Sequence, residues 1–190
     1  MKARRNLSLK SAEELVASLQ SSTPATDFAW LAGIIDGEGC IRSWYQMQYR
    51  KHRKYPRLMV GLHIVNTDAR MISKIYEIFL HQLGYTKMEP AKGRRRTRYS
   101  WHVVGRQLWV ALSLVLPYLV TKKEQGELAI DLQQRFMSFK RRIPLRDVTN
   151  GRILPSGPAY DKEELYERDQ LHRRLKSLHL TKTPINEGGE

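Results

Sequence analysis

Hydrophobic positions recur with helical spacing in the first part of the chain. A Ser-x-x-Glu capping box at Ser11 and the spacing of the leucines that follow predict a short amphipathic helix over residues 11–21. Residues 27–37 are apolar almost throughout, with Asp27 placed to cap the start and Gly37 at the end. This pattern predicts a second helix that is buried on nearly every side.

Two later segments alternate between apolar and polar residues, as a β-strand with one dry face does. Residues 41–50 place Ile41, Tyr45, Met47 and Tyr49 on that face. In residues 57–65, the core-facing positions are Leu58, Val60, Leu62 and Ile64. The basic turn at 51–54 joins the two strands into a hairpin.

A second hairpin follows further along the chain. Residues 85–89 and 96–104 read as strands around a turn at 90–93, with Tyr99, Trp101 and Val103 facing inward. Helices are predicted over residues 68–83, 106–116, 123–139 and 162–178, the last one capped by Asp161 and Glu164. Helices and antiparallel hairpins in one chain indicate an α+β fold.

Composition divides the chain into three parts. Residues 27–142 carry the order helix, two strands, helix, two strands, helices, and we expect them to form the core. Residues 1–26 are an N-terminal helical extension. After Arg142, prolines and glycines indicate a linker, so residues 143–190 are expected to be a basic linker and a C-terminal helix.

The charge and the cysteine content narrow the class of partner. The 190 residues carry a formal charge of +14, which favours a polyanion such as DNA, RNA or an acidic membrane. The single Cys40 excludes an internal disulfide, and the six histidines are not closely spaced, so any metal is expected on oxygen ligands. Without a long apolar run, we expect a soluble, intracellular protein that does not enter membranes.

Residues 31–39 read Leu-Ala-Gly-Ile-Ile-Asp-Gly-Glu-Gly. This segment closely resembles the nine-residue LAGLIDADG signature of the homing endonucleases and departs from it at Ile34, Gly37 and Glu38. The motif also heads the α-β-β-α-β-β-α order of that family, so the resemblance covers residues 27–142. It implies the LAGLIDADG homing-endonuclease fold, in which a curved antiparallel sheet forms a DNA-binding saddle. The alternative is an ordinary core helix with incidental carboxylates at its end.

The same segment has a strip of small residues suited to close approach of a second backbone. The obvious partner is the same helix of a second copy, so we expect a homodimer with one motif per chain. Twofold pairing would bring two Asp36 and two Glu38 to the helix C-termini, where they need a shared cation. The expected interface residues are Leu31, Ala32, Gly33, Asp36 and Gly37.

The resemblance assigns roles to individual residues. It implies that Glu38 binds Mg²⁺ or Mn²⁺ together with the carbonyl of Gly37, and that Asn66 lies near the attacking water. It also implies that Lys122 stabilises the phosphate in the transition state, and Arg70 is a candidate phosphate clamp. Several alternatives are open: Asn66 or Thr67 only caps the next helix, Arg70 is merely solvated, Lys123 takes the place of Lys122, and Asp36 only orients the turn.

The outward positions of the two hairpins are rich in groups that can contact base edges and phosphates. They are Arg42, Trp44, Gln46, Gln48, Arg50, Arg57, His63, Lys87, Arg96, Arg98, Ser100 and His102. An antiparallel ribbon fits the major groove of B-DNA, whereas the narrow groove of A-form RNA excludes it. An ordinary wet sheet face is the alternative, above all for Lys87 and Ser100. The basic residues of the tail helix either extend phosphate contacts or are solvated.

Together these features predict a site-specific homing endonuclease that makes a staggered double-strand cut in a long pseudo-palindromic DNA site by Mg²⁺-dependent phosphodiester hydrolysis. The resemblance implies an enzyme of intron homing, encoded in an intron or by a free-standing gene, in the cytoplasm or nucleoid of a prokaryote or in an organelle matrix. Two alternatives use the same scaffold: a splicing maturase that binds intron RNA, and a DNA-binding regulator that does not cleave.

Overall fold

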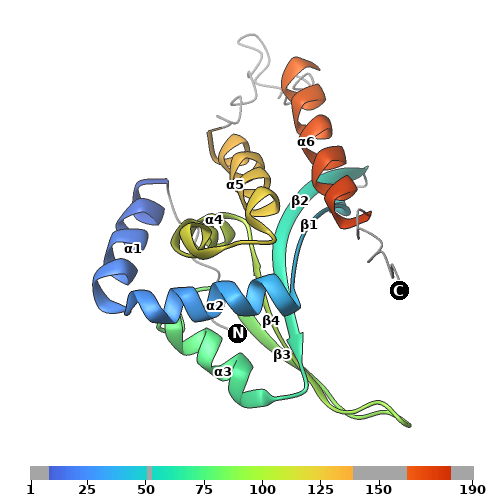
Figure 1. Ribbon diagram of the computed structural model, residues 1–190. Coiled ribbons are helices and arrows are strands. Elements are labelled where there is room, and N and C mark those ends of the chain that lie inside the picture. Colours follow the sequence, from blue (N-terminus) through green and yellow to red (C-terminus); the bar gives the residue numbers. More distant parts are fainter. Residues whose placement is uncertain (1–8, 51–52, 139–161, 181–190) are drawn as a thin grey trace, which may run out of the picture.

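In the computed structural model, residues 9–50, 53–138 and 162–180 are described, and they alternate helices with two antiparallel hairpins (Figure 1). The elements are α1 (Leu9–Ser22), α2 (Ala25–Glu38), β1 (Gly39–Arg50), β2 (Arg53–Asn66), α3 (Ala69–Ile78), β3 (Tyr85–Glu89), β4 (Arg98–Val104), α4 (Arg106–Val115), the short 3-10 helix η1 (Leu116–Tyr118), α5 (Lys123–Ser138) and α6 (Lys162–Leu180). This order confirms the predicted α+β class. The predicted linker and the Asp161 cap lie outside the described residues.

The four strands form one antiparallel sheet in the order β1-β2-β4-β3. Figure 1 shows α2 to α5 gathered on one side of this curved sheet, and α6 beside the far end of the β1–β2 hairpin. The sheet residues that meet the helices are fully or almost fully buried: Ile41, Val60, Leu62, Ile64, Trp101 and Val103. The opposite face therefore carries the polar positions of both hairpins. The buried core also takes in Ala12 and Leu19 of α1 and Leu175 of α6.

The inward face of β1 is not dry along its whole length, contrary to the prediction. Ile41 is fully buried, but Tyr45 and Met47 are each 50% exposed, and the side chain of Tyr49 lies outside the description. The hairpin extends past the helices that cover the rest of the sheet. Near this end α6 contacts β1: Asp169 accepts a hydrogen bond of 3.3 Å from the Tyr45 hydroxyl, and the Ser43 hydroxyl lies 2.7 Å from Nδ1 of His172.

The end of α3 and the residue that caps its start differ from the sequence prediction. The helix expected to run to residue 83 ends at Ile78, because Leu80 and His81 adopt positive φ values of 48° and 58°. At its start, the carboxylate of Asp68 accepts the backbone N–H of Arg70 and is the N-cap. Neither Asn66 nor Thr67 takes that place.

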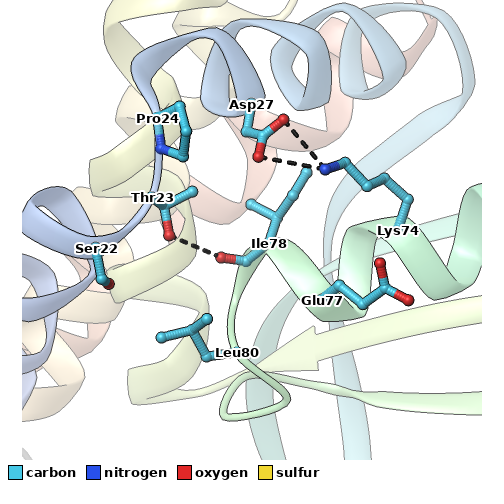
Figure 2. A pocket seen from close by; sticks show the side chains of 8 residues that line it. All are labelled: Ser22, Thr23, Pro24, Asp27, Lys74, Glu77, Ile78 and Leu80. Carbon is cyan, nitrogen blue, oxygen red and sulfur yellow. Dashed lines mark hydrogen bonds and ion pairs between the residues drawn. The ribbon is translucent and has the colours of Figure 1, made fainter.

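The start of α2 is fixed against α3 by two side-chain contacts, shown in Figure 2. The buried hydroxyl of Thr23 donates to the carbonyl of Ile78 at 3.2 Å, and Nζ of Lys74 lies 3.3 Å from the carboxylate of Asp27. Asp27 was the expected cap of this helix. However, α2 begins earlier, at Ala25, without a side-chain cap, so Asp27 is free to pair with α3. Both contacts join the start of α2 to α3.

None of the helices in the described ranges combines the length and the apolar character needed to cross a membrane.

Candidate functional site

The C-terminus of α2 passes directly into β1, and this junction carries the acidic end of the motif. The N–H of Gly39 donates to the carbonyls of Ile34 and Ile35. A Cβ on Gly39 would lie 2.7 Å from the carbonyl oxygen of Ile35, so only glycine fits this tight exit. Glu38, the last residue of α2, is exposed at the junction.

Asp36 turns its carboxylate toward the segment that precedes α5. It accepts the backbone N–H of Val120 at 2.8 Å and that of Lys122 at 2.9 Å. Burial raises the pKa of Asp36, but hydrogen bonds from Val120, Lys122 and Thr121 outweigh it and hold the pKa below its ordinary value. Asp36 is therefore ionised and bound within its own chain.

The side chain of Lys122 in turn contacts the end of α2. Its Nζ donates to the carbonyls of Ile35 and Asp36 at 2.8 and 2.6 Å, so the ammonium lies at the C-terminus of the helix. Burial lowers the pKa of Lys122, opposed by the charges of Asp36, Cys40 and Glu38. Lys123, by contrast, is an exposed first residue of α5. The structure thus brings Lys122, and not its neighbour, to the end of α2.

Asn66 lies at the same end of the sheet as the α2 terminus. Gly39 pairs with Ile64, and Asn66 follows two residues later as the last residue of β2. Its Oδ1 accepts a hydrogen bond from the backbone N–H of Asp68 at 2.8 Å. The side-chain NH₂ is therefore the group of Asn66 that can donate a hydrogen bond to a ligand or water.

Arg70 is occupied by an ion pair in the free protein. Its Nη2 lies 2.8 Å from the carboxylate of Asp68, and its side chain is 92% exposed. The contact lowers the pKa of Asp68 and raises that of Arg70. Exposed pairs of this kind are weak, so a phosphate could compete for the guanidinium.

The donors at the α2 terminus match a hard divalent cation, although one chain supplies few of them. The described residues contain no cluster of three or more His, Cys, Asp and Glu side chains that could hold a metal. Glu38 offers a carboxylate beside backbone carbonyls, while both oxygens of Asp36 are already used. Mg²⁺ binds through one or two carboxylates plus phosphate oxygens and water. Glu38 and the Gly37 carbonyl therefore fit as the ligands that the protein would supply.

One face of α2 is left open, which corrects the prediction of a helix buried on nearly every side. Phe28, Leu31, Ala32 and Ile35 are buried, but Trp30 is 39% exposed. Gly33 and Gly37 are exposed as well, and a Cβ built on either meets nothing within 4 Å. Of the five expected interface residues, Leu31 and Ala32 therefore face the core of their own chain, and the open strip is formed by Trp30, Gly33 and Gly37.

The strand pairing places the predicted polar positions together on the outer face of the sheet. Arg42, Gln46, Arg57 and Arg98 are exposed, and the guanidinium of Arg42 lies 5.5 Å from the ring of Trp44. Arg96 is exposed in the loop before β4, which begins at Arg98 and not at residue 96. The side chains of Gln48 and Arg50 lie outside the description. Ser100 is only 6% exposed, so it faces outward beneath its neighbours.

Glu89 neutralises part of the positive charge on this face. Its carboxylate pairs with Lys87 at 2.8 Å and with Arg98 at 2.7 Å. These two contacts lower the pKa of Glu89. Lys87 and Arg98 therefore have an internal partner that the sequence pattern did not reveal.

A stack of rings crosses the middle of the same face. His63 pairs with His102, and their rings stack with centroids 3.8 Å apart; Tyr85 stacks on His102 at 5.0 Å. Nε2 of His102 also lies 3.0 Å from the Ser100 hydroxyl. Tyr85 was missed as a member of this face, although alternation from Lys87 points to it.

We expect this stack to make the fold sensitive to acid. Burial lowers the pKa of both histidines, that of His102 to about 4. The charges of His63 and Lys87 lower the pKa of His102 further, and the charge of Arg42 lowers that of His63. The folded state favours neutral rings. Their contribution to the free energy of unfolding is therefore complete above the ordinary pKa of 6.5 and is lost as the pH falls toward 4. Allowing for partial exposure, the loss should reach about 1–2 kcal/mol.

Thermal unfolding between pH 7 and pH 4 measures this loss. His102→Gln should start from a lower melting temperature and show a flatter pH dependence than the parent, because carboxylate titration is common to both. Parallel pH profiles for the two proteins would exclude the histidine stack as the acid-sensitive element.

Most basic residues of α6 are bound within the chain. Arg168 is 4% exposed and lies over the ring of Phe136, His172 contacts Ser43, and Arg174 pairs with Glu124 at 2.6 Å. Arg173 pairs with Asp169. Lys176 instead lines a groove of about 540 Å³ at the edge of β1, together with Arg42 and Trp44 of the outer face. Arg168 is thus a packing residue, whereas Arg173, Arg174 and Lys176 remain exposed and are solvated as predicted.

Comparison with known proteins gives a structural likeness. The sequence matches no protein-family model and no curated protein. A crystal structure of the homing endonuclease I-CvuI in complex with its target, in the presence of calcium, is 24% identical and matches with a TM-score of 0.55 over 81% of this chain and 82% of that one. A second structure of I-CvuI, with the I-CreI target, magnesium and uncleaved DNA, matches over 80% and 82% at the same identity and TM-score. At this identity the likeness establishes the fold.

Proposed function

We propose that this chain, which has the LAGLIDADG homing-endonuclease fold, is a divalent-metal-dependent DNA endonuclease that acts as a homodimer. The observation that carries the proposal is the junction at the end of α2. There an exposed carboxylate, Glu38, lies beside a helix terminus capped by the ammonium of Lys122. A curved sheet with a polar, mainly basic outer face begins at the same point.

Each residue at the junction has a part in phosphodiester hydrolysis. Glu38 and the carbonyl of Gly37 would hold Mg²⁺ or Mn²⁺, and the bound ion supplies Lewis acidity and an activated water. Lys122 places a positive charge where negative charge develops on the phosphate. Asn66 donates from its amide to the attacking water. Arg70 leaves Asp68 to bind the scissile phosphate, at small cost because that pair is exposed.

The outer face of the sheet would lie in the major groove of duplex DNA. Arg42, Gln46 and Arg57 are exposed there and free to read base edges, and arginine and glutamine suit guanine and adenine respectively. The loop with Arg94, Arg95 and Arg96 is also exposed and suits phosphate contacts. Core residues 27–142 would bind and cut, while the N-terminal helical extension and the C-terminal helix support the core.

Dimerisation through the open strip of α2 would complete the enzyme. Gly33 and Gly37 allow a second α2 to approach closely, and exposed Trp30 would be covered in the process. Twofold symmetry then predicts two active sites near a common axis and a long pseudo-palindromic target cut on both strands. A homing role in a prokaryote or an organelle is what the resemblance to the LAGLIDADG family implies.

Selection of bound DNA tests this recognition. The protein is incubated with a randomised duplex library in Ca²⁺, which takes oxygen ligands in a looser geometry than Mg²⁺ and should retain bound DNA uncut. We expect the enriched duplexes to share one long sequence with twofold symmetry, and A-form duplex RNA to compete poorly. Enrichment without a shared or symmetric sequence would contradict the proposal, and strong competition by structured RNA would favour a splicing maturase.

A further inference from the structure

Two helix ends of opposite polarity meet at the candidate site. The C-terminus of α2 carries partial negative charge, and the N-terminus of α5 carries partial positive charge. The carboxylate of Asp36 lies at the start of α5, and the ammonium of Lys122 lies at the end of α2. Each helix end therefore lies beside a side chain of opposite charge that comes from the other segment.

The contact at Asp36 is bidentate. Oδ2 accepts the N–H of Val120 at 2.8 Å, and Oδ1 accepts the N–H of Lys122 at 2.9 Å. Two hydrogen bonds to one planar carboxylate fix both the distance and the orientation of the backbone. Since both oxygens are engaged, this group is poorly placed to serve as a metal ligand.

Little else holds the segment that carries Lys122. Leu119 is buried, but Val120 is 80% exposed and Thr121 is exposed too. Lys122 itself is the residue whose carbonyl accepts the first α5 hydrogen bond, from the N–H of Gly126 at 2.9 Å. Hydrophobic packing thus fixes the chain on either side of residues 120–122, while polar contacts determine their path.

We propose that Asp36 is a positioning residue, whose carboxylate fixes residues 120–122 and thereby places the Lys122 ammonium at the C-terminus of α2, next to Glu38. The catalytic consequence rests on the proposed function, whereas the positioning itself does not. This role is separate from the predicted place of Asp36 in the dimer interface, because it depends on the contacts of Asp36 with Val120 and Lys122 of its own chain.

The positioning is tested on the free protein by nuclear magnetic resonance. In the parent, we expect slow hydrogen exchange at the backbone amides of Val120 and Lys122, and an observable side-chain ammonium signal from Lys122 held by two carbonyls. Asp36→Ala should raise both exchange rates at least about tenfold and remove the ammonium signal. Asp36→Asn, which keeps one acceptor oxygen, should give a smaller effect. Glu127→Ala, which removes an exposed carboxylate of α5, is the matched control and should change neither.

Two results would overturn the proposal. Unchanged exchange in Asp36→Ala would show that the carboxylate does not fix the segment. Faster exchange with an unaltered Lys122 ammonium signal would show that Asp36 holds the backbone but does not place the side chain. If Asp36→Ala does not fold, the Asp36→Asn protein gives the same readouts, and the same two results count against the proposal.

The catalytic consequence has its own readout. With a cleavable target, Asp36→Ala should lower the single-turnover cleavage rate about 10- to 100-fold with little change in DNA affinity. Combined with Lys122→Met, it should add almost nothing to the loss caused by Lys122→Met alone. Additive losses would contradict action through Lys122. Absence of cleavage in the parent would overturn the proposed function and leave the resonance result standing.

Discussion

Glu38→Gln is expected to reduce DNA cleavage at least about 1,000-fold while leaving duplex affinity nearly unchanged. Glutamine keeps the size of the side chain but replaces an anionic ligand with a neutral amide that binds a hard divalent cation poorly. Glu38 is exposed at the end of α2, so the fold should not depend on its charge. Single-turnover cleavage and equilibrium binding of the selected duplex give the two quantities.

Glu127→Gln is the matched control for this substitution. Glu127 is an exposed carboxylate of α5, and its replacement changes the net charge by the same amount. The control should cleave at the parental rate. Equal activity of Glu38→Gln and the parent would remove Glu38 from the chemistry, and an equal loss in both variants would assign the effect to net charge.

Gly33→Leu is expected to dissociate the dimer without unfolding the chain. A Cβ on Gly33 meets nothing within 4 Å in the monomer, so the larger side chain costs the fold little. Across a twofold axis the same side chain enters the interface twice, and overpacking costs about 1–3 kcal/mol at each site. The dimer dissociation constant should therefore rise about 30- to 20,000-fold, and cleavage should fall with dimer occupancy.

Sedimentation over a range of protein concentrations measures the dissociation constant, and thermal unfolding checks the fold. Ser73→Leu adds the same side chain at an exposed position on α3 and should leave the dimer intact. A monomeric parent, or a Gly33→Leu protein that remains dimeric at every concentration, would contradict pairing through this face of α2.

The sequence predicted those parts of the fold whose signals are local. Alternation identified both hairpins, and the motif located Glu38 and the small residues of α2. Helical spacing also identified α4 and α5 within about one residue. These patterns follow from the periods of helix and strand, which depend only on neighbouring residues.

Contacts between distant segments could not be predicted in this way. Asp36 and Lys122 are 86 residues apart, and nothing in either local sequence indicates that they contact each other. The stack of His63 on His102 depends on the register between β2 and β4, which are not consecutive along the chain. The exposure of Tyr45 and Met47 depends on how far the helical layer extends over β1, which alternation cannot show.

Some errors came from competition between equally good local signals. Several residues before α3 can cap a helix, and the backbone selected Asp68 while Asn66 supports it from the preceding turn. Asp27 suited a cap as well, but Pro24 begins α2 earlier and the carboxylate pairs with Lys74. In both cases the sequence identified residues able to cap a helix, and the three-dimensional arrangement determined which groups they contact.

The most direct test of the central claim is to transfer the complex with the selected duplex from Ca²⁺ to Mg²⁺ and to sequence every DNA end that forms. Staggered cuts on both strands, symmetric about the centre of the site and absent with Glu38→Gln, are the predicted result. DNA that stays bound and intact at every Mg²⁺ concentration would contradict the claim and identify the chain as a DNA-binding protein that does not cleave.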